Sequence, residues 1–177
     1  NVFPHHECEI AQSETANECS FARYWMHNNM VTVDGQKMGK SLGNFVTLKD
    51  AFKKFSPLTI RFFVLNTHYS SPINYSDEAL DAANTGLERL HNTIRSLRER
   101  MESSSGTEGL DTWKTKLESY KNSFEDAMNE DFNTSEALAV LFNLSKDVNS
   151  LLNTDEKISK GVLSEINSFY LVYGGDV

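Results

Sequence analysis

The spacing of apolar positions divides the chain into two parts. From residue 76 onward, apolar residues recur every three or four positions, as in helices that bury one face. Ser76, followed by two acidic residues, predicts the start of the longest helix, because a hydroxyl and carboxylates favour a helix N-terminus. Its apolar stripe consists of Leu80, Ala83, Leu87, Leu90, Ile94, Leu97 and Met101.

Three further apolar stripes follow the first and predict three more helices. A Ser-rich connector at 103–106 separates the first two helices, and Asn133-Thr134 starts the third. Gly174-Gly175 is expected to end the last helix, because glycine readily adopts the left-handed conformation found after helices. We expect an antiparallel bundle. The later stripes lie at 113–128, 138–151 and 162–173.

The first 75 residues lack a sustained helical stripe and predict a small α/β region. Residues 30–33 are typical of a short strand, and Asp34-Gly35 of the turn after it. Pro72 interrupts residues 66–75, which are expected to form a loop. The predicted helices cover 5–18, 48–55 and 57–65, with Thr47 and Ser56 as N-caps of the last two and Pro57 at the first helical position of the third. The fold class is therefore mainly α: an α/β remnant, a helical connector and an antiparallel bundle.

Composition is that of an ordinary globular protein. Charged residues make up 24% and hydrophobic residues 39% of 177 positions. No apolar run approaches the ~20 residues of a membrane span, so we expect no membrane association. Two cysteines cannot build a disulfide framework, which favours a reducing, cytoplasmic setting.

The net charge of −8 is unevenly distributed. Residues 35–61 carry six cations and one acid, whereas residues 108–165 carry six lysines and twelve acids. A basic segment on an acidic body is able to meet phosphates, although an ordinary solvated surface explains the charges equally well.

Lys37-Met38-Gly39-Lys40-Ser41 places two lysines three residues apart, in a glycine-flanked segment. Mobile ammonium groups suit phosphate charge. The segment is not a phosphate loop, because that motif needs a glycine where Asp34 stands. An exposed lysine pair on a turn is the alternative.

His5 and Glu9 stand four residues apart, so a helix would present them on one face, as a metal site requires. An ordinary surface pair has the same spacing. His6 is an alternative ligand at a spacing of three. Cys8 and Cys19 fit no zinc spacing and are expected to be small buried hydrophobes.

Several segments resemble cysteinyl-tRNA synthetases, which are class I aminoacyl-tRNA synthetases. Residues 3–14 resemble the family's zinc-binding segment, and residues 37–41 resemble its Lys-Met-Ser-Lys-Ser loop, with Gly39 in place of serine. Gly39 is expected to loosen that loop. Residues 56–63 and 131–138 resemble the helix after the loop and the bundle motif.

The resemblance implies ATP-dependent activation of cysteine to cysteinyl adenylate and its transfer to tRNA(Cys) in protein synthesis. By this resemblance, Lys37 and Lys40 are catalytic and bind ATP with Gly39 and Ser41, the ATP carrying Mg²⁺. His5 and Glu9 would hold one Zn²⁺ together with two cysteines from sequence missing here. His27 either lines the nucleotide pocket or packs.

The resemblance also implies a division of the chain. Residues 1–46 would end the catalytic domain, 47–75 would contact the tRNA stem, and 76–177 would form a tRNA-binding bundle. Family members carry a histidine nucleotide motif and an anticodon domain absent here, so we expect a fragment, inactive alone and monomeric. The candidate tRNA contacts are Lys49, Lys53, Lys54 and Arg61.

Two other functions stay open. One is a related ligase that joins cysteine to an amino-sugar in thiol biosynthesis, which usually departs from the Glu9-Ile10-Ala11-Gln12 stretch found here. The other is a catalytically silent tRNA-binding relative, against which the intact His5, Glu9, Lys37 and Lys40 argue.

Overall fold

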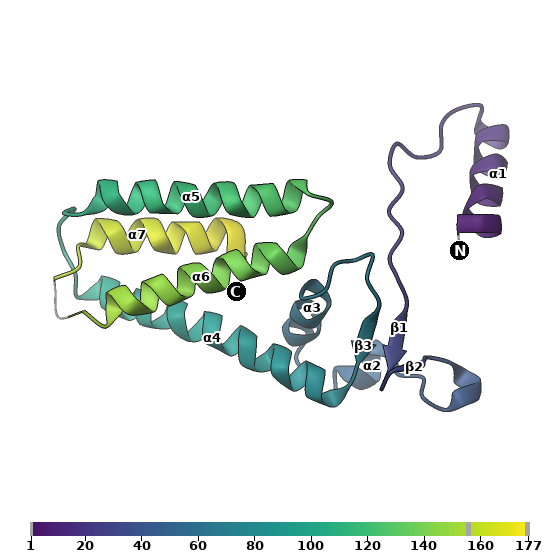
Figure 1. Cartoon of the computed structure of the whole chain (residues 1–177), viewed down its shortest axis with the longest axis horizontal. Helices are drawn as coiled ribbons and strands as arrows, with labels where there is room; N and C mark the ends of the chain where they lie inside the picture. Colours follow the sequence, from purple (N-terminus) through teal and green to yellow (C-terminus); the bar gives the residue numbers. More distant parts are fainter. Residues whose placement is uncertain (1, 155–156, 176–177) are drawn as a thin grey trace.

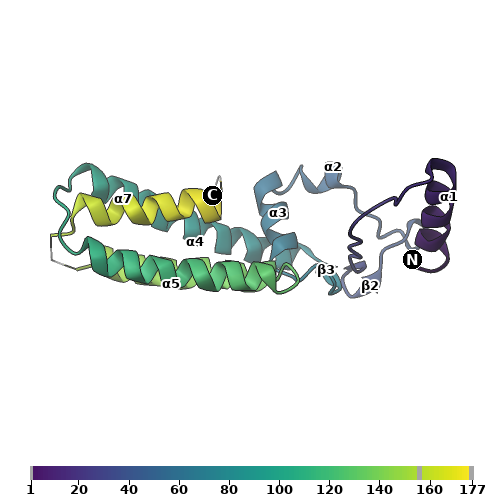
Figure 2. The same cartoon turned by 90° about the horizontal axis from the view of Figure 1, so that it is seen from above.

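The computed structural model describes residues 2–154 and 157–175. Figures 1 and 2 show three parts in a row: the four-helix bundle, a small sheet flanked by α2 and α3, and α1 at the far end. The prediction of a mainly α chain with a small α/β part is therefore confirmed.

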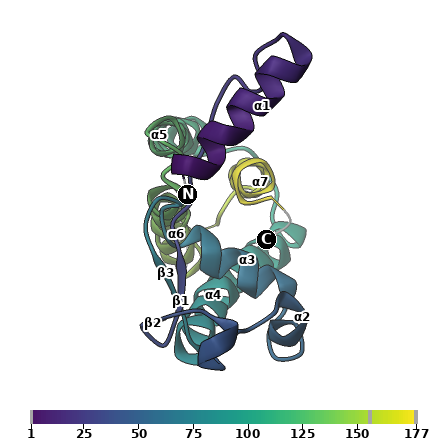
Figure 3. The same cartoon turned by 90° about the vertical axis from the view of Figure 1, so that its right-hand side faces the viewer.

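The bundle consists of α4 (Asp77–Glu102), α5 (Leu110–Asn129), α6 (Thr134–Leu152) and α7 (Lys160–Phe169), and successive helices run antiparallel (Figure 1). Figure 3 looks along these helices from one end. A π-helical turn, Tyr170–Gly174, extends α7. The predicted apolar stripes form the core, because burying one face of each helix stabilises the packed state. No helix within 2–154 or 157–175 combines the length and hydrophobicity needed to cross a bilayer.

The predicted N-caps are confirmed. The side-chain oxygens of Thr47, Ser56 and Ser76 accept hydrogen bonds of 3.1, 3.0 and 3.1 Å from the backbone N–H three residues later. Pro57 occupies the first turn of α3 (Pro57–Leu65), where its missing N–H leaves no bond unmade. Helix α2 (Leu48–Ala51) is shorter than the predicted 48–55, because turns replace helix after Ala51.

The sheet contains β1 (Val31–Val33), β2 (Gln36–Lys37) and β3 (Ile73–Tyr75) in the order β2-β1-β3. Strands β1 and β2 form a hairpin around the predicted turn, where Asp34 and Gly35 both have positive φ, 49° and 76°. The second strand, β2, was not predicted. Strand β3 pairs parallel to β1. The loop prediction is therefore wrong over residues 73–75, because Pro72 precedes the strand and leaves its hydrogen-bonding ladder intact.

Helix α1 (Glu7–Asn17) follows a π-helical turn, Val2–His6, and no residue of either is buried. It stands apart from the other helices in Figures 1 and 2. Cys8 and Cys19 are exposed, so the prediction that they are buried is wrong. The reason is that α1 stands apart from the other helices, so none of them covers Cys8, and Cys19 lies beyond the end of α1.

Gly86 lies in the middle of α4, where glycine is usually unfavourable. A Cβ there would stand 3.2 Å from Phe62 Cε1 on α3 and 3.5 Å from Phe142 Cζ on α6. The missing side chain therefore allows both aromatic rings to approach α4. The rings themselves meet edge to face, with centroids 6.1 Å apart.

Candidate functional site

The lysine segment begins on the hairpin. Lys37 lies on β2 opposite Thr32 of β1, and a short 3₁₀ helix, Lys40–Leu42, carries the second lysine. Both lysines are exposed. The hairpin thus fixes one lysine on a strand while the other projects from the irregular segment that follows.

Asn44 holds this segment together, a role that the sequence interpretation missed. Its Oδ1 accepts a hydrogen bond of 2.9 Å from the Gly39 N–H, and its Nδ2 donates one of 3.1 Å to the Lys37 carbonyl. The Asn44 side chain therefore holds the backbone at Lys37 and at Gly39 through two hydrogen bonds. An asparagine just after the lysine pair was the available signal, because its side-chain amide offers both a donor and an acceptor to the backbone.

Gly39 is not required by the backbone. Its φ of −164° is extended, and a Cβ would find its nearest atom, Leu42 Cδ1, at 3.8 Å, an ordinary contact. Serine would fit here without strain. The Gly39 N–H donates its hydrogen bond to Asn44, and the loosening expected from glycine stays a prediction.

The two lysines of the segment carry uncompensated charge. Across residues 2–154 and 157–175, neither Lys37 nor Lys40 has a carboxylate within 4.0 Å. Lys40 Nζ lies 5.7 Å from the centroid of the Phe45 ring. An aromatic face attracts an ammonium group without neutralising it. Both charges are thus available to an anionic ligand.

Two of the four predicted tRNA contacts already have acidic partners. Lys53 and Lys54 each bind a carboxylate at 2.7 Å, those of Asp50 and Asp77. The hydrogen bond to Asp77 raises the pKa of Lys54, and the bonds from Lys53 and Thr47 lower the pKa of Asp50. Lys49 and Arg61 are exposed and, in the described part of the chain, have no such partner. Of the four candidates, Lys53 and Lys54 are therefore neutralised by carboxylates, whereas Lys49 and Arg61 have no carboxylate partner among the described residues.

The predicted zinc ligands, His5 and Glu9, are both exposed, on the turn before α1 and on its first turn. An imidazole nitrogen and a carboxylate oxygen are suitable zinc donors, and neither side chain makes a hydrogen bond within the described residues. The same residues contain no group of three or more potential ligands. The pair therefore fits half of a zinc site, and Cys8 and Cys19 do not complete it.

His6 pairs with His27, an arrangement that the sequence interpretation missed. Their Nδ1 atoms lie 3.2 Å apart, and the rings stack with centroids separated by 5.0 Å. The indole of Trp25 stacks on His6 at 5.8 Å. The stack therefore brings His6, in the turn before α1, against the segment that leads to β1.

Comparison with known proteins matches two families to this chain. The catalytic domain of class I (C) tRNA synthetases matches residues 1–85, and the DALR domain matches residues 123–174. The chain is also similar to a solved structure, the ternary complex of Agrobacterium radiobacter K84 agnB2 LeuRS with tRNA and LeuAMS. The TM-score is 0.65 at 24% identity, over 83% of this chain and 20% of that one, and the likeness concerns the fold alone.

Curated relatives described as cysteine--tRNA ligase match most of the chain. The protein of Chlorobium chlorochromatii is 54% identical over 163 residues, covering 92% of this chain and 31% of the relative. The protein of Chlorobaculum tepidum is 52% identical over 155 residues, which cover 88% of this chain and 30% of the relative. The protein of Bacillus cereus B4264 is 42% identical over 177 residues, which cover 98% of this chain and 38% of the relative. The chain thus spans about a third of the length of these relatives.

Proposed function

The chain belongs to the class I tRNA synthetases, and from this premise we propose that it forms part of a cysteine--tRNA ligase. The enzyme would join cysteine to ATP, release pyrophosphate and transfer the cysteinyl group from the adenylate to the 3′ end of tRNA(Cys). The observation that carries the proposal is the hairpin-mounted pair of free lysines, Lys37 and Lys40, in a chain 42–54% identical to such ligases.

The lysines would act on the phosphates of ATP. The carboxylate of cysteine attacks the α-phosphorus while the bond from that phosphorus to the bridging oxygen of the β-phosphate breaks. Negative charge then builds on the phosphate oxygens and on the departing pyrophosphate. Lys40, assisted by Lys37, would stabilise that charge, and Gly39 and Ser41 would lie along the bound nucleotide. ATP would bring Mg²⁺ with it.

Asn44 would keep the two lysines in fixed positions relative to each other during this step. It fixes the Gly39 N–H and the Lys37 carbonyl, so the backbone between the ammonium groups is tied at two points. A loop held in this way loses less conformational entropy when it closes on a nucleotide.

His5 and Glu9 would hold a zinc ion together with two cysteine ligands from outside this sequence. When bound, zinc would supply a soft acceptor for the substrate thiolate, which distinguishes cysteine from serine. The exposure of both side chains leaves them accessible to such ligands.

The connector would contact tRNA through Lys49 and Arg61, the two candidates without acidic partners. Lys53 and Lys54 would contribute less, because binding a phosphate would require them to leave Asp50 and Asp77. Residues 1–46, 47–75 and 76–177 would serve as catalytic end, stem contact and tRNA-binding bundle. The enzyme would act in the cytoplasm as a monomer.

The test uses the native gene product that carries this sequence. Cysteine-dependent exchange of pyrophosphate into ATP is expected, followed by attachment of labelled cysteine to tRNA(Cys). Exchange without tRNA labelling, but with labelling of an amino-sugar, would identify the related thiol-pathway ligase instead. Absence of exchange in a folded, zinc-supplied preparation would show a silent relative.

A further inference from the structure

The hairpin that carries Lys37 is too small to hold itself in place. Strand β2 has only two residues, and it pairs with β1 at two positions, Thr32 opposite Lys37 and Val33 opposite Gln36. Among the described residues, β2 is an edge of the sheet, with β1 as its one neighbour. A two-stranded hairpin is marginally stable at best without further packing. The position of Lys37 therefore depends on contacts from other parts of the chain.

Strand β3 supplies such contacts at the turn of the hairpin. The Asp34 N–H donates a hydrogen bond of 3.1 Å to the Tyr75 carbonyl, and the Gly35 N–H donates one of 2.7 Å to Oδ1 of Asn74. Asp34 has a positive φ, which is unfavourable for a non-glycine residue, so the turn needs bonds that hold it. Two neighbouring residues of β3 thus bind both central residues of the turn.

Asn74 also binds the residue opposite Lys37. In the sheet, Asn74 is the partner of Thr32, and Thr32 is the partner of Lys37. Directly paired residues place their side chains on the same face of a sheet, so these three form a row across the strands. The Thr32 hydroxyl donates a hydrogen bond of 3.0 Å to Asn74 Oδ1 and lies at a longer distance, 3.3 Å, from the Ile73 carbonyl. One side-chain oxygen therefore binds both the turn and the strand beside the lysine.

The Asn74 amide binds the hairpin through its oxygen. A backbone N–H is always a donor, so the oxygen rather than the nitrogen must face Gly35. This oxygen has two lone pairs, and the Gly35 N–H and the Thr32 hydroxyl provide one donor each. Within 2–154 and 157–175, the amide nitrogen makes no hydrogen bond. Aspartate offers the same acceptor and is therefore the conservative substitution.

Strand β3 is itself fixed to α4. Figure 1 shows that β3 runs beside β1 and leads directly into α4. Ser76, the residue after the strand, caps this helix. Tyr75 packs against a small core cluster that includes Ala51 of α2 and Leu80 of α4, and Leu80 is fully buried. Asn74 thus lies on a strand anchored to the bundle, while its side-chain oxygen holds the hairpin.

We propose that Asn74 is a positioning residue for Lys37, which fixes the hairpin to β3 and α4 so that the ammonium group meets the phosphates of ATP. The inference rests on the proposed function, in which Lys37 assists Lys40 at these phosphates. Asn44 holds the backbone at Lys37 and Gly39, whereas Asn74 acts on the turn and on the strand opposite Lys37. The two amides therefore have separate roles.

The experiment measures cysteine-dependent exchange of pyrophosphate into ATP by the native gene product. We expect Asn74→Ala to lower kcat about 10- to 100-fold, because a charged group displaced by about 1 Å loses much of its effect. The KM for cysteine should stay within about 2-fold, because the substitution does not touch the zinc ligands. Asn74→Asp keeps the acceptor and should stay within about 5-fold of the parent.

A double-mutant cycle separates positioning from a general loss of stability. If Asn74 acts through Lys37, Asn74→Ala should cost less than about 3-fold when it is introduced into Lys37→Ala. A merely structural role would give the same loss in both backgrounds. Hydrogen exchange adds a readout without catalysis: the Gly35 amide should exchange about 2- to 10-fold faster in Asn74→Ala and at the parent rate in Asn74→Asp.

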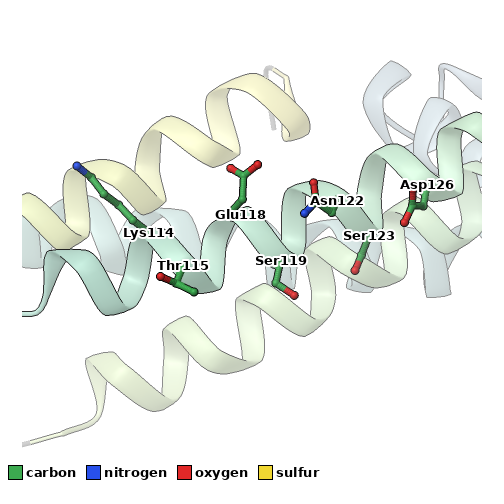
Figure 4. Close-up of a pocket in the computed structure, with 7 residues that line it drawn as sticks. All are labelled: Lys114, Thr115, Glu118, Ser119, Asn122, Ser123 and Asp126. Carbon is green, nitrogen blue, oxygen red and sulfur yellow. The ribbon is translucent and has the colours of Figure 1, made fainter.

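Asn122 supplies the matched control. Figure 4 shows it on α5, among the polar side chains that line a hollow there. It is exposed, and its side chain makes no hydrogen bond within the described part of the chain. Asn122→Ala removes the same atoms as Asn74→Ala and should leave exchange within about 2-fold of the parent.

Circular dichroism shows whether each variant is folded. Unchanged kcat in Asn74→Ala, equal losses in Asn74→Ala and Asn74→Asp, or equal losses in the two Lys37 backgrounds would each overturn the proposal. If Asn74→Ala does not fold, Thr32→Val tests the same link, because it keeps the β-branched shape and loses the hydroxyl.

Thr32→Val should lower kcat about 3- to 10-fold, and an unchanged kcat would also overturn the proposal. Absence of pyrophosphate exchange in the parent would instead count against the proposed function. The Gly35 amide would still report in that case whether Asn74 holds the hairpin, and an unchanged rate in Asn74→Ala would overturn the positioning role.

Discussion

The Tyr69 hydroxyl donates a hydrogen bond of 2.6 Å to Oδ1 of Asp131, 62 residues away in the sequence. Asp131 lies in the turn between α5 and α6, where it and Phe132 both have a φ of 54°. The neighbouring His68 Nε2 lies 2.9 Å from the Asp131 carbonyl. The loop after α3 therefore holds a turn of the bundle in a conformation that is unfavourable for non-glycine residues.

The same loop reaches the other part of the molecule. The Asn29 N–H donates to the Tyr69 carbonyl at 2.9 Å, and Asn29 Nδ2 donates to the Ser70 carbonyl at 2.8 Å. Residue 29 leads into β1 and so into the lysine hairpin. Tyr69 thus stands between the bundle and the segment that carries the lysines.

Tyr69→Phe should loosen this link. Without its donor, the Asp131 carboxylate loses one of the bonds that fix the α5–α6 turn. We expect the amides of Asn29 and Phe132 to exchange about 2- to 10-fold faster, the range that one net hydrogen bond allows. Tyr75→Phe is the control, because the Tyr75 hydroxyl makes no hydrogen bond with any described residue. Equal exchange rates in the two variants would contradict the link.

The helices and their caps could be predicted because their signals are local. Ser56 and Ser76 precede the residues they cap by only three positions, and the stripe of α4 repeats within each turn. Strand β3 could not be predicted in this way, because its partner β1 lies about forty residues earlier. The Tyr69–Asp131 and His6–His27 contacts were not predicted either, because their partners are also far apart in the sequence.

In the candidate site, too, the features carried by a short motif could be predicted, and those that depend on the folded chain could not. Lys37 and Lys40 are recognisable because a short motif contains both, and the structure shows them free of carboxylates among the residues it describes. The role of Asn44 depends on how the backbone folds back, which no spacing rule states. The acidic partners of Lys53 and Lys54 required the folded connector, Asp77 being 23 residues from Lys54.

Lys40→Ala should reduce cysteine-dependent pyrophosphate exchange by the native gene product at least ~100-fold, the loss typical of removing one group that stabilises transition-state charge. Zinc content should not change. Lys53→Ala is the matched control: its ammonium group already binds Asp50, so exchange should fall less than about 3-fold. Near-normal exchange after Lys40→Ala would remove this residue from the phosphate role.

Asn44→Ala should disorder the lysine segment while leaving both ammonium groups in place. Two hydrogen bonds are lost, at the Gly39 N–H and the Lys37 carbonyl. We expect pyrophosphate exchange to fall about 10- to 100-fold, because misplaced charged groups lose much of their effect. Gly39→Ser, which the backbone accommodates, should stay within about 2-fold of the parent. If Asn44→Ala were as active as Gly39→Ser, the amide would have no positioning role.

Glu9→Ala should weaken zinc binding and the preference for cysteine over serine together, because one lost donor lowers the affinity of the whole ligand set. Metal content is measured by elemental analysis of the purified native gene product, and preference by pyrophosphate exchange with each amino acid. Glu7→Ala, also exposed and on the same helix, is the control and should retain both properties. Unchanged zinc in Glu9→Ala would refute the ligand assignment.

Asp147→Asn should remove part of the pH dependence of stability. Hydrogen bonds from Lys116 and Tyr120 lower the pKa of the Asp147 carboxyl below its ordinary value. A lowered folded-state pKa means that the stabilisation is present above the unfolded pKa and disappears as the pH falls through the folded one. We expect the variant to melt about 2–4 °C lower at pH 7 and the difference to shrink toward zero below pH ~4.

Asp126→Asn is the control for this titration, because Asp126 lies on the exposed face of α5 without an ion pair among the residues that the structure describes. Its melting temperature should follow that of the parent at every pH. A difference between Asp147→Asn and the parent that stayed constant down to pH 3 would mean that the carboxylate charge is not what joins α5 to α6. Packing of the Tyr120 ring would then account for the contact.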